Sequence, residues 1–85
     1  MTAIPIGVNC HFDVDGGVEV KQIYYQGRWQ PVEQGRQWLD QVGRHILIMR
    51  PVASANESRV EEILLRATTL MWELRLPRGS QTRIV

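Results

Sequence analysis

The sequence contains few of the residues and motifs from which most catalytic and metal sites are built. Its single cysteine, Cys10, excludes an internal disulfide, and there are only two histidines. It has no glycine-rich phosphate loop, no zinc-type ligand spacing and no dinucleotide fingerprint. The chain is therefore expected to be non-enzymatic and to require no cofactor.

Long apolar runs are absent as well. The longest covers residues 46–49, which is far shorter than a membrane helix requires, and no basic segment followed by an apolar stretch opens the chain. These features predict a cytoplasmic protein with no membrane partner. Eighty-five residues allow one small domain. We expect it to span residues 1–76, with 77–85 as a flexible tail because that segment has almost no core pattern.

The charge is nearly balanced, with ten basic and nine acidic residues. This balance argues against a strong, non-specific grip on nucleic acid. Lys21 is the only lysine, so the other nine basic residues are arginines. Arginine is well suited to bidentate contacts with carboxylate or phosphate groups.

Strict alternation of apolar and polar residues near the start predicts a strand with one buried face. The apolar positions are Ile6, Val8, Cys10, Phe12 and Val14. We expect this strand, over 4–14, to pair with a second strand over 18–25 through a three-residue loop at 15–17. That loop would set the first residue after it opposite Val14. The apolar phase changes within the second strand, which predicts either a bulge near Lys21 or partial cover of both faces.

The middle of the chain indicates two more strands and a short break between them. Gln26 and Gly27 suit a two-residue turn, which would place Trp29 opposite Tyr24. We therefore expect strands over 28–33 and over 45–50. Between them, apolar residues at helical spacing followed by Gly43 predict a short helix or an irregular crossing near 36–42.

The last third fits two patterns. A capping box at 58–61 and an apolar stripe predict one amphipathic helix over 59–76. Alternation after Leu70 instead predicts strands over 59–66 and 70–76, with Leu65 facing Leu70 and Ile63 facing Trp72. Periodicity alone leaves both open.

Short motifs spread over residues 18–76 resemble a small bacterial family of unknown function. They are the turn at 25–28 (Tyr-Gln-Gly-Arg), Val32, Trp38, Val60 and the segment 69–74 (Thr-Leu-Met-Trp-Glu-Leu). Members carry an aromatic-x-Gly-Arg turn and close with a Thr-Gly-x-Trp-x-Leu strand. This chain has Leu70 where glycine is usual and Tyr25 where tryptophan is common. The resemblance implies a hairpin over 59–76 and no particular activity.

Together these patterns predict a mainly β fold. We expect a small antiparallel sheet of five or six strands that curls into a partly open barrel, with the short helix or crossing near 36–42. The alternative is an α+β fold in which a helix at 59–76 packs on a four-stranded sheet. The expected core comprises Val8, Phe12, Val20, Trp29, Trp38, Ile46, Ile48, Ile63 and Trp72.

Two groups of residues are candidate sites. His11, Asp13 and Asp15 would project from one face of a strand and could ligate a metal, although a solvated strand face ending in an Asp-Gly turn explains them equally simply. A curved sheet that bears Tyr25, Arg28 and Arg36 could stack bases and hold phosphate, unless these residues only flank turns and fill the core.

Neither candidate gives a reaction. The apolar neighbours expected around Cys10 would raise its thiol pKa, and His45 is expected to be a strand-end residue and no catalytic base. The leading hypothesis is a protein-interaction or self-associating module, either a homodimer or bound to another protein. The alternatives are a weak single-stranded nucleic-acid-binding accessory protein and a metal-binding domain.

Overall fold

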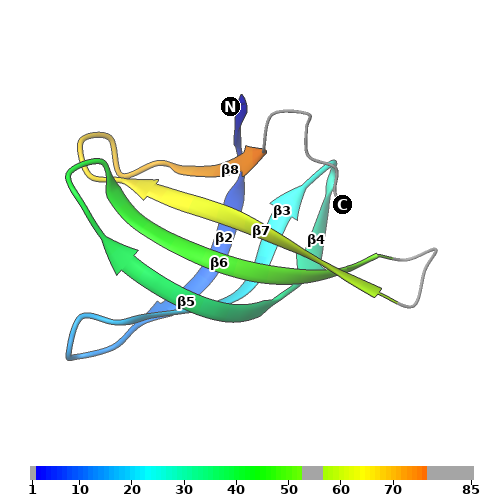
Figure 1. The fold of residues 1–85 in the computed structure, drawn as a ribbon, viewed down its shortest axis with the longest axis horizontal. Helices are drawn as coiled ribbons and strands as arrows, with labels where there is room; N and C mark the ends of the chain where they lie inside the picture. The colour runs from blue at the N-terminus through cyan, green and yellow to red at the C-terminus, as the bar shows by residue number, and fades with distance from the viewer. Residues whose placement is uncertain (1, 53–56, 77–85) are drawn as a thin grey trace, which may run out of the picture.

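The structure, a computed structural model, describes residues 2–52 and 57–76, and within them it contains eight strands and no helix. The predicted tail at 77–85 lies outside the described residues. The strands are β1 (Thr2–Pro5), β2 (Gly7–Phe12), β3 (Val18–Tyr25), β4 (Arg28–Pro31), β5 (Glu33–Leu39), β6 (Gly43–Val52), β7 (Glu57–Arg66) and β8 (Trp72–Leu76). All pairs are antiparallel, in a five-stranded sheet of order β1-β8-β7-β6-β5 and a three-stranded sheet of order β2-β3-β4. The mainly β prediction is confirmed (Figure 1).

The first hairpin has a longer loop than predicted. Phe12 pairs with Val18 and Cys10 with Val20, so residues 13–17 form the loop. The N–H of Asp13 donates to the carbonyl of Gly17 at 2.8 Å and closes it. The predicted bulge at Lys21 is confirmed, because the register shifts opposite it. Pairing two residues earlier than expected carries Phe12 past the end of the core, where it is 54% exposed, so its place in the predicted core is wrong.

The turn at Gln26 and Gly27 is confirmed, since both residues adopt positive φ, of 56° and 80°. Tyr24 and Trp29 pair across β3 and β4 as predicted, with ring centroids 5.3 Å apart and edge to face. This pair lies on the outer face of the smaller sheet. Trp29 is therefore 50% exposed and is not the core residue that we predicted.

The predicted short helix near 36–42 is wrong, because this segment continues the sheet as β5. Gln34 pairs with Ile48 and Gln37 with Ile46, so two residues on β5 stand against one on β6. The apolar residues whose spacing predicted a helix, Trp38, Leu39 and Val42, come after this bulge, where β5 ends and the chain turns. Gly43 is no helix cap. It opens β6 with φ at 154°, where an added Cβ would lie 2.0 Å from the carbonyl oxygen of Leu65.

The hairpin interpretation of the last third is confirmed, and the helix over 59–76 is wrong. Leu65 pairs with Trp72 and Ile63 with Leu74, two residues away from the predicted register, so the loop spans 67–71. The N–H of Arg66 donates to the carbonyl of Met71 at 3.0 Å and closes this loop.

The core lies between the inner faces of the two sheets. Val20, Ile46, Ile48 and Ile63 are buried as predicted. Val8 and Trp72 are half-buried and pack against this cluster. The other members of the cluster are Val18, Ile23 and Leu74. Trp38 is also half-buried, but on the outer face of the larger sheet, opposite His45.

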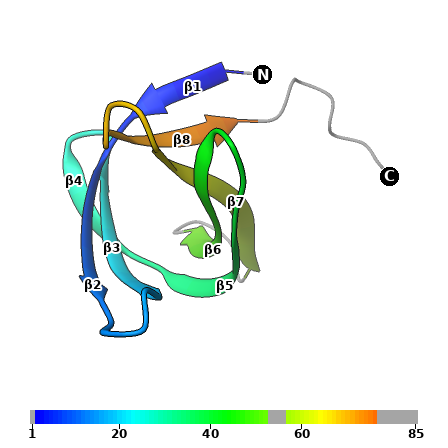
Figure 2. The same cartoon turned by 90° about the vertical axis from the view of Figure 1, so that its left-hand side faces the viewer.

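The described strands form two sheets that are not closed into a barrel, whereas we predicted one sheet curling into a partly open barrel. The chain crosses between the sheets at Ile6, from β1 to β2, and at Val32, from β4 to β5 (Figure 2). The remaining seam lies between β3 and β5, where no strand pairing is formed among the described residues. Two glutamine side chains bridge it instead.

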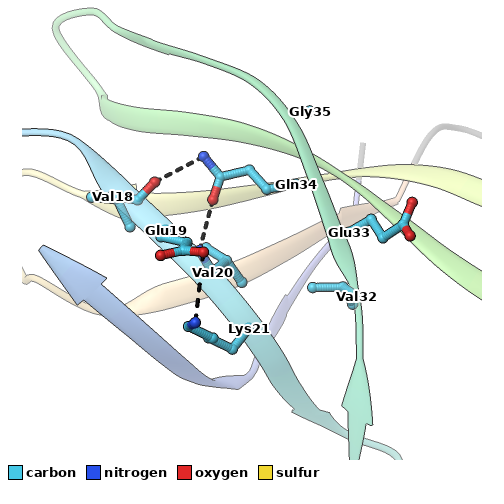
Figure 3. Close-up of a pocket in the computed structure, with 8 residues that line it drawn as sticks. All are labelled: Val18, Glu19, Val20, Lys21, Val32, Glu33, Gln34 and Gly35. Carbon is cyan, nitrogen blue, oxygen red and sulfur yellow. Dashed lines mark hydrogen bonds and ion pairs between the residues drawn. The ribbon is translucent and has the colours of Figure 1, made fainter.

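These bridges involve both ends of each glutamine amide. Gln34 Nε2 donates to the carbonyl of Val18 at 2.8 Å, and its Oε1 accepts from the N–H of Val20 at 2.7 Å (Figure 3). Gln37 also donates to Val18, at 2.9 Å. Side-chain amides thus occupy the positions that peptide groups of a neighbouring strand would take, and the edge of β3 is satisfied without closing a barrel.

Candidate interaction surface

The predicted metal ligands lie together only in part. His11 Nε2 is 3.7 Å from Asp13 Oδ1, and both side chains are exposed. Asp13 and Asp15 both approach Gly17, within 4 Å of where a Cβ would stand there. Across residues 2–52 and 57–76, no group of three His, Cys, Asp or Glu side chains is arranged to hold a metal ion. The geometry is that of a solvated, Asp-rich loop.

The residues predicted to hold nucleic acid do not form one surface. Tyr25 packs against the core, and the guanidinium of Arg50 lies 5.2 Å from the centre of its ring. Arg36 lies over Trp38 of the larger sheet, 5.0 Å from the ring centre. Arg28 is exposed, but it pairs with Tyr25 and so lies on the opposite face of the hairpin from the exposed rings of Tyr24 and Trp29.

Cys10 is half-buried on the inner side of β2, as the alternation predicted. Burial raises the pKa of its thiol, because the thiolate loses solvation there. A thiol of this kind is a poor nucleophile at neutral pH.

A polar network that sequence reasoning missed crosses the interior between the sheets. Arg50 makes a bidentate pair with Glu61, with both N–O distances at 2.8 Å, and also donates to Gln30 Oε1 at 2.9 Å. Gln30 in turn donates to the carbonyl of Tyr25 at 2.8 Å. The signal was present, since Arg50 follows Ile48 by two positions and therefore points inward with it. The network joins β3, β4, β6 and β7 and leaves its buried groups paired.

His45 lies on the outer face of the larger sheet, not at a strand end, and is only 5% exposed. Its Nδ1 is 2.6 Å from Glu62 Oε2, and its Nε2 is 2.9 Å from Asp40 Oδ2. The second contact is an ion pair that lacks hydrogen-bond geometry. The ring stacks on Trp38, with centroids 5.2 Å apart and planes at 3°. Sequence gave no hint of this site, because its two carboxylates come from a turn and from the next strand.

Burial by itself would lower the pKa of His45. The hydrogen bond with Glu62 and the contact with Asp40 outweigh this effect, so the pKa lies above its ordinary value. The pKa of Asp40 is lowered, chiefly by His45 and further by the N–H groups of Val42 and Gly43. The imidazolium form therefore fits this pair of carboxylates best.

Three loops lie at the same end of the molecule, at the left of Figure 1 and toward the viewer in Figure 2. The turns at 40–43 and 67–71 are joined by a hydrogen bond from Ala67 N–H to the carbonyl of Val42 at 2.9 Å. Arg44, at the start of β6, donates to the carbonyl of Gly16 at 2.8 Å and so ties in the loop at 13–17. Each loop and its flanks carry two exposed apolar side chains. We call this set the apolar end: Phe12, Val14, Leu39, Val42, Leu70 and Met71.

Leu70 is the most unusual member of the apolar end. It is 72% exposed, and its φ is 59°, in the left-handed region where L side chains crowd the backbone. Glycine would satisfy this turn without strain. Because most of its side chain is exposed, Leu70 gains little from burial to offset this strain.

Comparison of the chain with models of protein families, with curated proteins and with solved structures finds no match in any of the three. Within the described ranges there is no helix long and apolar enough to cross a membrane. The function is therefore inferred from the fold and from the exposed side chains.

Proposed function

We propose that this chain is a small, non-enzymatic cytoplasmic module that self-associates through its apolar end, as a homodimer. Leu70 is the observation that carries the proposal. Strained backbone that persists in a protein is found most often at functional positions. Here the strain presents a large apolar side chain to solvent at a loop tip. A cytoplasmic setting agrees with the free thiol of Cys10.

A second copy of the chain is the occupant that best matches this surface. Six exposed apolar residues lie on three loops at one end of the molecule, and the turns at 40–43 and 67–71 are joined directly, which favours an interaction surface there. A partner copy offers the same residues, so a twofold arrangement buries both sets at once, and twofold dimers are the commonest symmetric assemblies. A different protein with an apolar surface is the competing occupant, and the oligomeric state of the purified chain separates the two.

The test is the mass in solution by light scattering at micromolar concentration. We expect a mass above that of one chain, and we expect the double variant Leu39→Ser with Leu70→Ser to return it to one chain. Val60→Ser is the matched control, because Val60 is equally apolar and 63% exposed but lies on β7, outside the apolar end. A wild-type mass equal to that of one chain at these concentrations contradicts self-association. So does a control variant whose mass falls as far as that of the double variant.

A second candidate function is weak binding of single-stranded nucleic acid on the smaller sheet. The exposed rings of Tyr24 and Trp29 form a pair on which a base could stack, and Arg28, exposed at the end of the same hairpin, could contact a phosphate. The chain would then bind a labelled oligonucleotide at low salt, and the Arg28→Ala variant would not bind it. Unchanged fluorescence anisotropy at low salt removes this candidate. The contact between His11 and Asp13 offers no third ligand, so we do not propose metal binding.

A further inference from the structure

The carboxylate of Asp40 organises the turn at 40–43 as well as contacting His45. Its Oδ1 accepts from the N–H of Val42 at 2.9 Å and from that of Gly43 at 3.2 Å, while Oδ2 faces His45 Nε2. The carbonyl of Val42 then accepts from Ala67 in the neighbouring turn. One carboxylate therefore links the imidazole to two of the three loops of the apolar end.

The other side of the imidazole is fixed to the sheet. Glu62 holds Nδ1 from β7, and Leu64, directly opposite His45 on that strand, is fully buried. Trp38 of β5 covers one face of the ring by stacking on it. Because the ring cannot turn away, a change in its charge must act on the two carboxylates.

We propose that His45 is a proton-operated clasp that sets the shape of the apolar end. As an imidazolium it presents N–H groups to both Glu62 and Asp40 and holds the turn at 40–43 against the sheet. As a neutral imidazole it keeps one N–H, and the carboxylate that faces the bare nitrogen is repelled. Glu62 is the better-aligned partner, so the proton stays there and Asp40 is released together with its turn. The consequence for association rests on the proposed function; the movement of the turn does not.

The charged groups around the clasp define the direction of its response. Arg75 lies 3.6 Å from Glu62 and partly offsets its charge, and Arg36 stands over Trp38. Arg66 of β7 and Glu73 of β8 form an ion pair with each other, and Glu73 stands opposite Leu64, the residue that pairs with His45. The raised pKa of His45 means that the clasp is closed below the ordinary histidine value of about 6.5 and opens as pH rises through the higher, folded-state pKa. The lowered pKa of Asp40 keeps that carboxylate charged until well into the acid range.

Two NMR measurements on the full chain test this inference. The ring signals of His45 give its titration, and amide hydrogen exchange gives the protection of the Ala67 N–H group, which donates to the Val42 carbonyl, at each pH. We expect its protection factor to fall about tenfold or more as His45 loses its proton, because Val42 moves away with the released turn. Asp40→Asn keeps an oxygen acceptor for the Val42 and Gly43 amides but removes the charge, so in this variant the protection of Ala67 should not follow the histidine titration.

His11→Gln is the matched control, because His11 is the other histidine and is exposed. It should leave the response of the Ala67 amide unchanged. Protection that stays constant through the titration of His45, or that follows pH equally in Asp40→Asn, overturns the clasp. Light scattering of the wild-type chain below and above the titration adds the functional arm. An equal mass above one chain at both pH values overturns the regulation, and a single chain at both refutes the proposed function while the amide data still decide on the clasp.

Discussion

Leu70 combines a backbone conformation that destabilises the fold with a large apolar side chain that is exposed to solvent. A left-handed conformation costs a non-glycine residue about 1–2 kcal/mol, and exposure of the side chain recovers none of it. We predict that Leu70→Gly raises the free energy of unfolding by about 1 kcal/mol, net of the greater chain entropy of glycine. Urea unfolding measures this change at a concentration where the chain is single. A variant less stable than the wild type would show that Leu70 contributes to folding in a way that its exposure hides.

Four of the eight buried apolar residues in the described part of the chain were predicted individually, because period-two alternation assigns each residue to a face. Val20, Ile46, Ile48 and Ile63 follow that rule. Phe12 and Trp29 do not, and the reasons differ. Phe12 lies on the apolar face of its strand but beyond the end of the core, whereas Trp29 lies on the outer face and covers Gly7, where its ring comes within 3.6 Å of a Cβ position. Alternation indicates direction but not where a sheet stops.

At the scale of strands, the sequence predicted which strands pair better than it predicted their register, because the register depends on loop length. Three of the five antiparallel pairings between consecutive strands were expected from the sequence, namely β2 with β3, β3 with β4 and β7 with β8. Two of them, at 13–17 and 67–71, close with five-residue loops and are shifted by two positions. A shift of two keeps every side chain on its predicted face, so the alternation pattern could not detect it. The predicted helix had a different cause, because Trp38 and Leu39 end β5 and Val42 lies in the turn that follows, and this combination has helical spacing.

The seam between β3 and β5 gives a prediction about these two glutamines. Gln34→Ala leaves the N–H of Val20 without its acceptor at a part-buried position. We expect the free energy of unfolding to fall by about 1–3 kcal/mol, which is the usual cost of an orphaned buried group. Gln22→Ala is the control, because Gln22 bonds only to exposed Asn9. Urea unfolding compares them, and equal small losses would show that the glutamine bridge contributes nothing to joining the sheets.

At the scale of the molecule, the candidate surface depends on three loops whose meeting is a property of the topology. The sequence predicted turns near 13–17 and 67–71 but gave no reason to place them at one end with the turn at 40–43. The structure does so by a backbone hydrogen bond between Ala67 and Val42 and by the reach of Arg44 to Gly16. The local sequence pattern therefore could not show that these exposed residues lie at one end of the molecule. The same holds for the carboxylates around His45.

The central claim, that the apolar end is the surface through which two copies meet, is tested most directly by amide chemical shifts recorded over a range of protein concentrations. We expect concentration-dependent shifts confined to residues 12–17, 39–43 and 67–71. Shifts centred on Tyr24 and Trp29 of the smaller sheet, or spectra that do not change from micromolar to millimolar concentration, would contradict it.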